Sequence, residues 1–250
     1  MYHAYVHVRV NVMNSGLGFY IPELRYTFYG PIVFISILAG IATACIIMKK
    51  ADVRKETSIY TALLTFVSII ICSAVISISL AGDIRKVGFV GAGGALGLIL
   101  GATMSAVIFR DHIAESVCAW IVSAPLMYGL SKIACHVAGC CNGIVYHGIL
   151  HVTYGAKGDE SYFPVQLTET VAFLMIFAVG LWMYIKLSDR MKTAMIILFV
   201  SGMTKIILEF LRESHHGQII SGYQIVVFLI TISGVISINF IKKFSGGPGQ

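Results

Sequence analysis

Seven long apolar stretches constrain this 250-residue chain more than any other feature. A transmembrane helix needs about 20 consecutive apolar residues to cross a hydrocarbon core about 30 Å thick. Charged residues make up 12% of the chain, against about 25% in an average soluble domain, so most of the surface must face lipid. The sequence therefore predicts an all-α polytopic membrane protein, with spans at about 28–48, 58–80, 88–109, 114–135, 164–186, 192–210 and 219–241.

The spans divide the chain into three expected parts. Residues 1–26 form an N-terminal interfacial arm, residues 27–243 the seven-helix transmembrane domain, and residues 244–250 a flexible tail. One longer extracytoplasmic loop, at about 140–163, separates the fourth and fifth spans, and residues 151–154 in it are a candidate for a short hairpin.

Basic residues cluster after alternate spans, which predicts the orientation in the membrane. They follow the first, third, fifth and seventh spans, as Lys49, Lys50, Arg54 and Lys55, then Arg110, then Lys186, Arg190 and Lys192, then Lys242 and Lys243. Cytoplasmic loops carry such an excess, so the N-terminus and the long loop are expected outside and the C-terminus in the cytoplasm. Arg85, Lys86 and Lys157 lie on the other side and weaken this bias. The basic residues lack an aromatic stacking platform, so no nucleic-acid partner is expected.

Ionisable residues within or at the ends of spans usually mark function, because burying charge in lipid is costly. Near the end of the fourth span, Lys132 precedes a glycine-bounded break that contains Cys135, His136, Cys140 and Cys141. Lys132 and freed backbone N–H groups suit a phosphate group. Cysteine and histidine also suit zinc or redox chemistry, and a merely structural break is a further alternative.

Two more polar segments lie at the ends of the fifth and sixth spans. Gln166 and Glu169 are three residues apart and share a helix face, which indicates a polar cavity, although Glu169 also suits a helix N-terminus by itself. Lys205, Glu209 and Arg212 form one stripe, which favours an anion site facing the bundle.

The run 88–101 is rich in glycine, including Gly93, Gly94 and Gly97, and permits close approach of either another helix or a lipid head group. With the three polar segments it predicts a pocket near the outer leaflet for an anionic phospholipid.

These segments resemble the bacterial prolipoprotein diacylglyceryl transferase family over most of the chain, from the pair Tyr29-Gly30 to the seventh span. FPVQLTE (163–169) is similar to the family's His-Pro-x-Gln-Leu-Tyr-Glu, and KIILEFLRE (205–213) to its Arg-Phe-x-x-Glu-Phe-x-Arg. Residues 132–143 occupy the place of the family signature, and GAGGALG (91–97) that of its His-Gly-Gly-x-x-Gly.

The resemblance implies an enzyme of the bacterial cytoplasmic (inner) membrane that needs no cofactor. It would move a diacylglyceryl group from phosphatidylglycerol, or another anionic phospholipid, to an acceptor, most simply a lipoprotein-precursor cysteine thiol, and release glycerol phosphate. The implied phospholipid-binding residues are Tyr29, Gly93, Gly94, Gly97, Lys132, Gly143, Gln166, Lys205 and Arg212.

The chain departs from the family pattern where the family carries out proton transfer. Ala92 stands where the family has a histidine, and lysines at 132 and 205 replace arginines. Cys135 and Cys140 replace signature residues, and His136 is a hypothetical substitute base. The catalytic set expected here is therefore Cys135, His136, Glu169 and Glu209.

Two other functions fit the same residues. One is a membrane thiol or metal oxidoreductase built on Cys135, His136, Cys140 and Cys141. The other is an inactive phospholipid-binding homologue, which the absence of the family histidine favours.

Overall fold

The computed structural model describes residues 9–13, 16–81, 89–110, 112–215 and 217–245. Within them, seven helices are long and apolar enough to span a membrane: α1 (Tyr29–Lys50), α2 (Lys55–Ala81), α3 (Gly91–Ile108), α4 (Ile113–Ala138), α5 (Val165–Lys186), α6 (Arg190–Glu209) and α7 (Gly222–Ser245). All seven predicted spans are confirmed, and each helix lies within a few residues of its expected range. Residues 1–8 of the predicted arm, residues 246–250 of the tail, and Arg85 and Lys86 lie outside the described residues.

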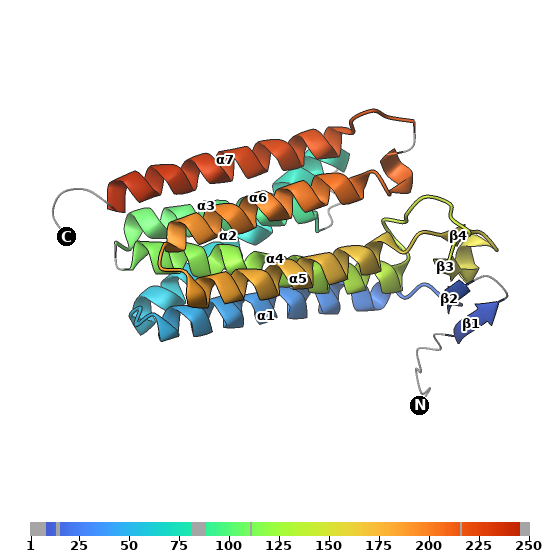
Figure 1. Ribbon diagram of the computed structural model, residues 1–250, viewed down its shortest axis with the longest axis horizontal. Coiled ribbons are helices and arrows are strands. Elements are labelled where there is room, and N and C mark those ends of the chain that lie inside the picture. The colour runs from blue at the N-terminus through green and yellow to red at the C-terminus, as the bar shows by residue number, and fades with distance from the viewer. Residues whose placement is uncertain (1–8, 14–15, 82–88, 111, 216, 246–250) are drawn as a thin grey trace.

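The helices run side by side in one bundle, with α4 at its centre (Figure 1). Trp120, Val122 and Ala119 of α4 are fully buried, and α4 packs against α1, α5, α6 and α3. Large apolar side chains are exposed on the outer helices, as expected for surfaces that face lipid. The polar residues of α4 are therefore held inside the protein.

Glycines on one face of α3 permit close packing against α2. A Cβ atom on Gly93 would lie 2.6 Å from Ser73 Cα, and one on Gly97 would lie 2.6 Å from Ile69 Cα. Such contacts are too short for any side chain, so the backbones of the two helices touch at these positions. Much of the glycine pattern thus serves helix packing.

A small sheet lies at one end of the bundle, where the sequence predicted an arm and a loop with a candidate hairpin at residues 151–154 (Figure 1). Within the described residues it has the order β1-β2-β3-β4, formed by β1 (Arg9–Met13), β2 (Gly16–Ile21), β3 (Leu150–Tyr154) and β4 (Ser161–Tyr162). β2 pairs in parallel with β3, in the register Ile21↔Tyr154, and β3 pairs antiparallel with β4. The arm and the long loop therefore form one structure. The signal for this pairing was weak, because parallel partners far apart in sequence leave no local pattern.

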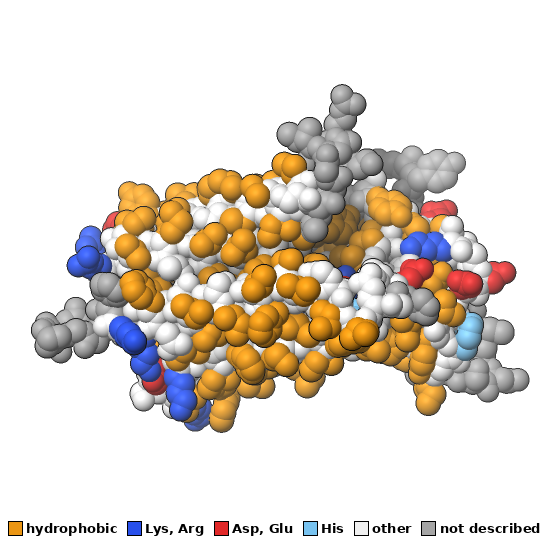
Figure 2. Space-filling view, turned by 90° about the horizontal axis from the view of Figure 1, so that it is seen from above, with side chains coloured by type: hydrophobic (Ala, Val, Ile, Leu, Met, Phe, Trp, Pro, Cys, Tyr) orange, Lys and Arg blue, Asp and Glu red, His pale blue; other side chains and the backbone are white. Residues whose placement is uncertain are grey.

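Charge is distributed unevenly between the two ends of the bundle. Figure 2 shows Lys and Arg gathered at the end that carries the C-terminus, an apolar surface along the bundle, and acidic side chains at the end that carries the sheet. The basic loops before α2 and α6 lie at the first end, as the spans alternate. The orientation itself, with the long loop outside the cell, stays a prediction.

Candidate functional site

Three cations and two carboxylates meet inside the sheet end of the bundle. Glu169, near the start of α5, is fully buried and faces all three cations. Lys205 Nζ donates to Glu169 Oε1 at 2.7 Å, Lys132 Nζ lies 3.2 Å from Oε2, and Arg212 Nη2 lies 3.1 Å from both oxygens. Lys205 Nζ and Arg212 Nε also lie 2.7 and 3.3 Å from Glu209 Oε2. We call these five residues the charge cluster.

The charge cluster keeps one net positive charge, because three cations face two carboxylates. Burial opposes the charged form of Arg212, but the acidic groups around it, Glu169 foremost, together outweigh that effect, so the pKa of the guanidinium lies above its ordinary value. Buried ions persist only when they are paired, and here every charge has a partner. An anion with a single charge would make the site neutral.

Two tyrosine rings lie against lysines of the charge cluster. The Lys132 ammonium lies 4.6 Å from the centre of the Tyr128 ring, and the Lys205 ammonium 5.0 Å from that of Tyr223. Sequence reasoning missed both tyrosines. Tyr128 precedes Lys132 by four residues on the same helix face, which is a usable signal, whereas Tyr223 reaches the site from another helix and leaves none.

A short extended segment after α4 links the ends of α5 and α6. The backbone of Gly143 forms an antiparallel bridge with Arg212. Ile144 N donates to Leu211 O at 3.0 Å, and Phe163 N donates to Ile144 O at 2.9 Å. A Cβ atom on Gly143 would collide with the carbonyl oxygen of Phe163. Gly143 is thus required for packing, and this segment fixes where Arg212 lies.

A chain of hydrogen bonds connects the loop to Gln166. Gln166 Nε2 donates to the carbonyl oxygen of Cys140 at 2.8 Å and to Tyr154 Oη at 3.2 Å. Tyr154 Oη lies 3.4 Å from His136 Nδ1. Burial raises the pKa of Tyr154, so its hydroxyl keeps its proton. His136, the candidate base, is thereby held on the loop side of the charge cluster.

The sulfur atoms of Cys135, Cys140 and Cys141 all lie within 4.8 Å of one another. Helix α4 ends in a turn in which Cys140 N donates to Cys135 O at 3.1 Å, and Gly139 there has φ +61°. Hydrogen bonds from the neighbouring thiols, and then Lys132 and Arg212, lower the pKa of Cys141. His136 is not a member of this sulfur group. We call Cys135, Cys140 and Cys141 the thiol cluster.

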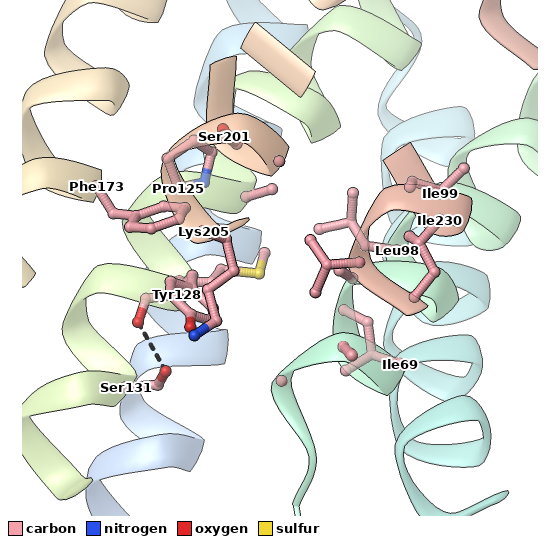
Figure 3. Close-up of a pocket in the computed structure, with 18 of the residues that line it drawn as sticks. Ile69, Leu98, Ile99, Pro125, Tyr128, Ser131, Phe173, Ser201, Lys205 and Ile230 are labelled. Carbon is pink, nitrogen blue, oxygen red and sulfur yellow. Dashed lines mark hydrogen bonds between the residues drawn. The ribbon is translucent and has the colours of Figure 1, made fainter. Parts of the chain in front are cut away.

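An apolar cavity adjoins the charge cluster and contains about 1000 Å³ of empty space, its open mouth included. Figure 3 shows Tyr128, Phe173 and Lys205 on one side and Leu98, Ile99 and Ile230 on the other. Lys205 is the one cation among the residues found to line it. The cavity therefore suits a ligand with long apolar parts and an anionic group at one end.

The structure brings most of the predicted site residues together. Lys132, Glu169, Lys205, Glu209 and Arg212 form the charge cluster, Gln166 and Gly143 adjoin it, and Gly94 lines the cavity.

Two predicted ligand residues have other neighbours. Gly93 and Gly97 pack against α2 and not against the cavity, because close helix packing and head-group access give the same glycine pattern in a sequence. Tyr29, in contrast, lies within electrostatic range of Lys132 and of the three clustered cysteines, and its Oη donates to Phe89 O at 3.5 Å.

Comparison with known proteins gives two findings. Residues 17–242 match the family model described as "Prolipoprotein diacylglyceryl transferase". The chain is also 26% identical over 165 residues to the phosphatidylglycerol–prolipoprotein diacylglyceryl transferase 2 of Clostridium perfringens (strain 13 / Type A). That match covers 64% of this chain and 64% of the relative.

Proposed function

Because the chain belongs to the prolipoprotein diacylglyceryl transferase family, we propose that it moves a diacylglyceryl group from phosphatidylglycerol to a cysteine thiol of a lipoprotein precursor. The observation that carries the proposal is the convergence of Lys132, Lys205 and Arg212 on Glu169 beside an apolar cavity. Membrane spans, an anion site and a cavity for acyl chains are the features that such a donor requires.

The charge cluster would bind the donor through its phosphate. A phosphodiester carries one negative charge, which matches the net positive charge of the cluster. Lys205 lines the cavity, so its ammonium is placed to meet a head group whose chains lie against Leu98 and Ile230. Glu169 and Glu209 hold the cations in position between turnovers.

The same cations would stabilise the leaving group. In the proposed step the acceptor sulfur forms a bond to the glycerol carbon, and the bond from that carbon to the phosphate oxygen breaks. The electron pair remains on glycerol phosphate, which gains negative charge as it leaves. Preorganised cations in a buried site favour this gain and cost little reorganisation.

The acceptor would approach from the sheet end, beside the thiol cluster and His136. The acceptor thiol must lose a proton. Ala92, which stands where the family has a histidine, has no side-chain group that can accept it. His136 is the histidine that the sequence offers for this role, and Tyr154 holds its ring in place. Cys135 lies next to it, one turn after Lys132.

The test uses the purified full chain in phospholipid nanodiscs. Labelled phosphatidylglycerol and a peptide that carries a lipoprotein-precursor cysteine are added, and release of labelled glycerol phosphate is measured. We expect release with phosphatidylglycerol and little with phosphatidylcholine. The same peptide with serine in place of cysteine is the control for the acceptor. Retention of phosphatidylglycerol without turnover would instead indicate an inactive lipid-binding homologue.

A further inference from the structure

We propose that the thiol cluster of Cys135, Cys140 and Cys141 binds one Zn²⁺ ion with an open fourth position, where the acceptor thiol binds as a thiolate. The role of the acceptor rests on the proposed transferase function, whereas the metal site rests on the thiol cluster alone.

The distances between the sulfur atoms fit a common metal ion. Zinc–sulfur bonds of about 2.3 Å at tetrahedral angles place thiolates about 3.8 Å apart. The three sulfurs lie within 4.8 Å of one another, so small side-chain rotations bring them to bonding distance. A disulfide would require far closer contact and would leave the third thiol out.

The backbone holds these side chains together before any metal binds. The turn at the end of α4 returns Cys140 to Cys135, and Cys140 Sγ lies 3.7 Å from Cys135 O. Cys141 has φ +57°, a left-handed conformation that is uncommon for a residue other than glycine. Gln166 anchors the Cys140 carbonyl at 2.8 Å. A strained residue in a fixed turn is frequent at functional sites.

The number of ligands indicates a catalytic rather than a structural metal. Among the described residues, no fourth His, Cys, Asp or Glu atom joins this group. Structural zinc sites are closed by four protein ligands, whereas catalytic sites keep a position for water or substrate. Cys135 is buried and Cys141 is exposed, so a ligand from solvent can reach the metal.

The location of the site explains what the open position would bind. Cys135 follows Lys132 by three residues on α4, so the thiol cluster lies next to Lys132. Lys132 is one of the cations proposed to hold the phosphate. A thiol that coordinates zinc is deprotonated outright. The metal would therefore favour the thiolate form of the acceptor, and His136 would accept the proton.

The acceptor S–H displaces water from zinc and passes its proton to the candidate base His136, which leaves a zinc-bound thiolate. Its sulfur then forms the carbon–sulfur bond as the carbon–oxygen bond to phosphate breaks. The zinc keeps its oxidation state throughout, and the thioether product leaves the metal.

The first experiment measures metal in the purified full chain after incubation with Zn²⁺. We expect about one zinc ion per chain, and the loss of most of it in Cys140→Ser and in Cys141→Ser. Cys45→Ser is the matched control, because Cys45 lies on α1 away from the thiol cluster, and it should keep its zinc. In the unmodified protein, a strong chelator should expose three additional reactive thiols. Absence of zinc, or equal zinc in all variants, would refute the site even where a cysteine variant folds poorly.

The second experiment tests the open position with Co²⁺ in place of Zn²⁺. Sulfur–cobalt absorption should appear, and it should change when the cysteine peptide is added but not when the serine peptide is added. An unchanged spectrum with the cysteine peptide would refute activation of the acceptor.

Transfer activity then separates this proposal from the transferase function. Chelation should abolish transfer and Zn²⁺ should restore it. Full transfer by metal-free protein would refute the role of zinc and leave the transferase function standing. A cobalt spectrum that responds to the peptide without any transfer would support the site and refute the transferase.

Discussion

Both carboxylate oxygens of Glu169 lie 3.1 Å from the same nitrogen, Nη2 of Arg212, although the two residues are 43 positions apart in the chain. The contact joins the start of α5 to the end of α6, and Lys132 and Lys205 share the same carboxylate. One acidic residue thus organises three cations.

Replacement of Glu169 by glutamine should strongly reduce both stability and transfer activity. The variant keeps the size of the side chain but leaves three buried cations with Glu209 as the one carboxylate of the charge cluster. Removing one partner from a buried ion pair costs about 3–5 kcal/mol, so we expect a lower Tm in detergent and loss of transfer. The exposed Glu56→Gln is the matched control and should behave like the unmodified protein. A Glu169→Gln protein with unchanged Tm would contradict the charge cluster as described.

Lys205→Met should weaken the binding of anionic lipid. Loss of a hydrogen bond to a charged group costs about 1.5–3 kcal/mol, which corresponds to roughly 10- to 150-fold in affinity for phosphatidylglycerol. Lys205→Arg keeps the charge and should recover much of the loss. Lys186→Met, at the exposed end of α5, is the control. Equal affinity in Lys205→Met and Lys186→Met would mean that the phosphate binds elsewhere.

His136→Ala tests the candidate base. A general base contributes about 10²- to 10⁴-fold, so transfer should fall by that factor while lipid binding is kept. His147→Ala, which changes an exposed histidine of the loop after α4, should leave transfer unchanged. Transfer at the rate of the unmodified protein would assign deprotonation to the thiol cluster alone.

Gly97→Ala should destabilise the bundle by forcing α3 away from α2. The new methyl group would lie 2.6 Å from Ile69 Cα, and overpacking of this kind costs about 1–3 kcal/mol. Gly30→Ala is the control, because nothing lies within 4 Å of the added atom. Thermal unfolding in detergent measures both variants, and equal Tm values would show that α2 and α3 can move apart at no cost.

Asp189→Ala should loosen the turn between α5 and α6. Asp189 caps α6 by accepting from Lys192 N at 2.9 Å and also accepts from Lys242 Nζ at 2.7 Å. Loss of a capping side chain costs about 1 kcal/mol. Asp189→Asn should keep the cap and lose the ion pair, and its Tm should lie between those of Asp189→Ala and the unmodified protein.

The Asp189 interactions also predict a pH dependence. The hydrogen bond from Lys242 lowers the pKa of the Asp189 carboxyl, so this stabilisation is present above the ordinary carboxyl pKa. It is lost as the pH falls through the lowered value. The Tm difference between the unmodified protein and Asp189→Asn should therefore shrink in acid, and a constant difference would contradict the ion pair.

The helices were predictable because each is a long apolar run, and the bilayer fixes the required length. The charge cluster was largely predictable too, since Lys205, Glu209 and Arg212 share a helix stripe and Gln166 and Glu169 share a face. The pairing of β2 with β3 was not, because its partners lie about 130 residues apart. Gly93 and Gly97 show a further limit, since the pattern does not reveal what the small residue approaches.

The bridge between Gly143 and Arg212 has a consequence for how the protein responds to its membrane. Arg212 is positioned by backbone pairing with a loop, so its depth is set by the protein rather than by the surrounding lipid. A thinner or thicker bilayer would tilt the outer helices before it separated the guanidinium from Glu169. Bilayer thickness should therefore change how readily lipid enters the cavity more than how firmly its phosphate is held.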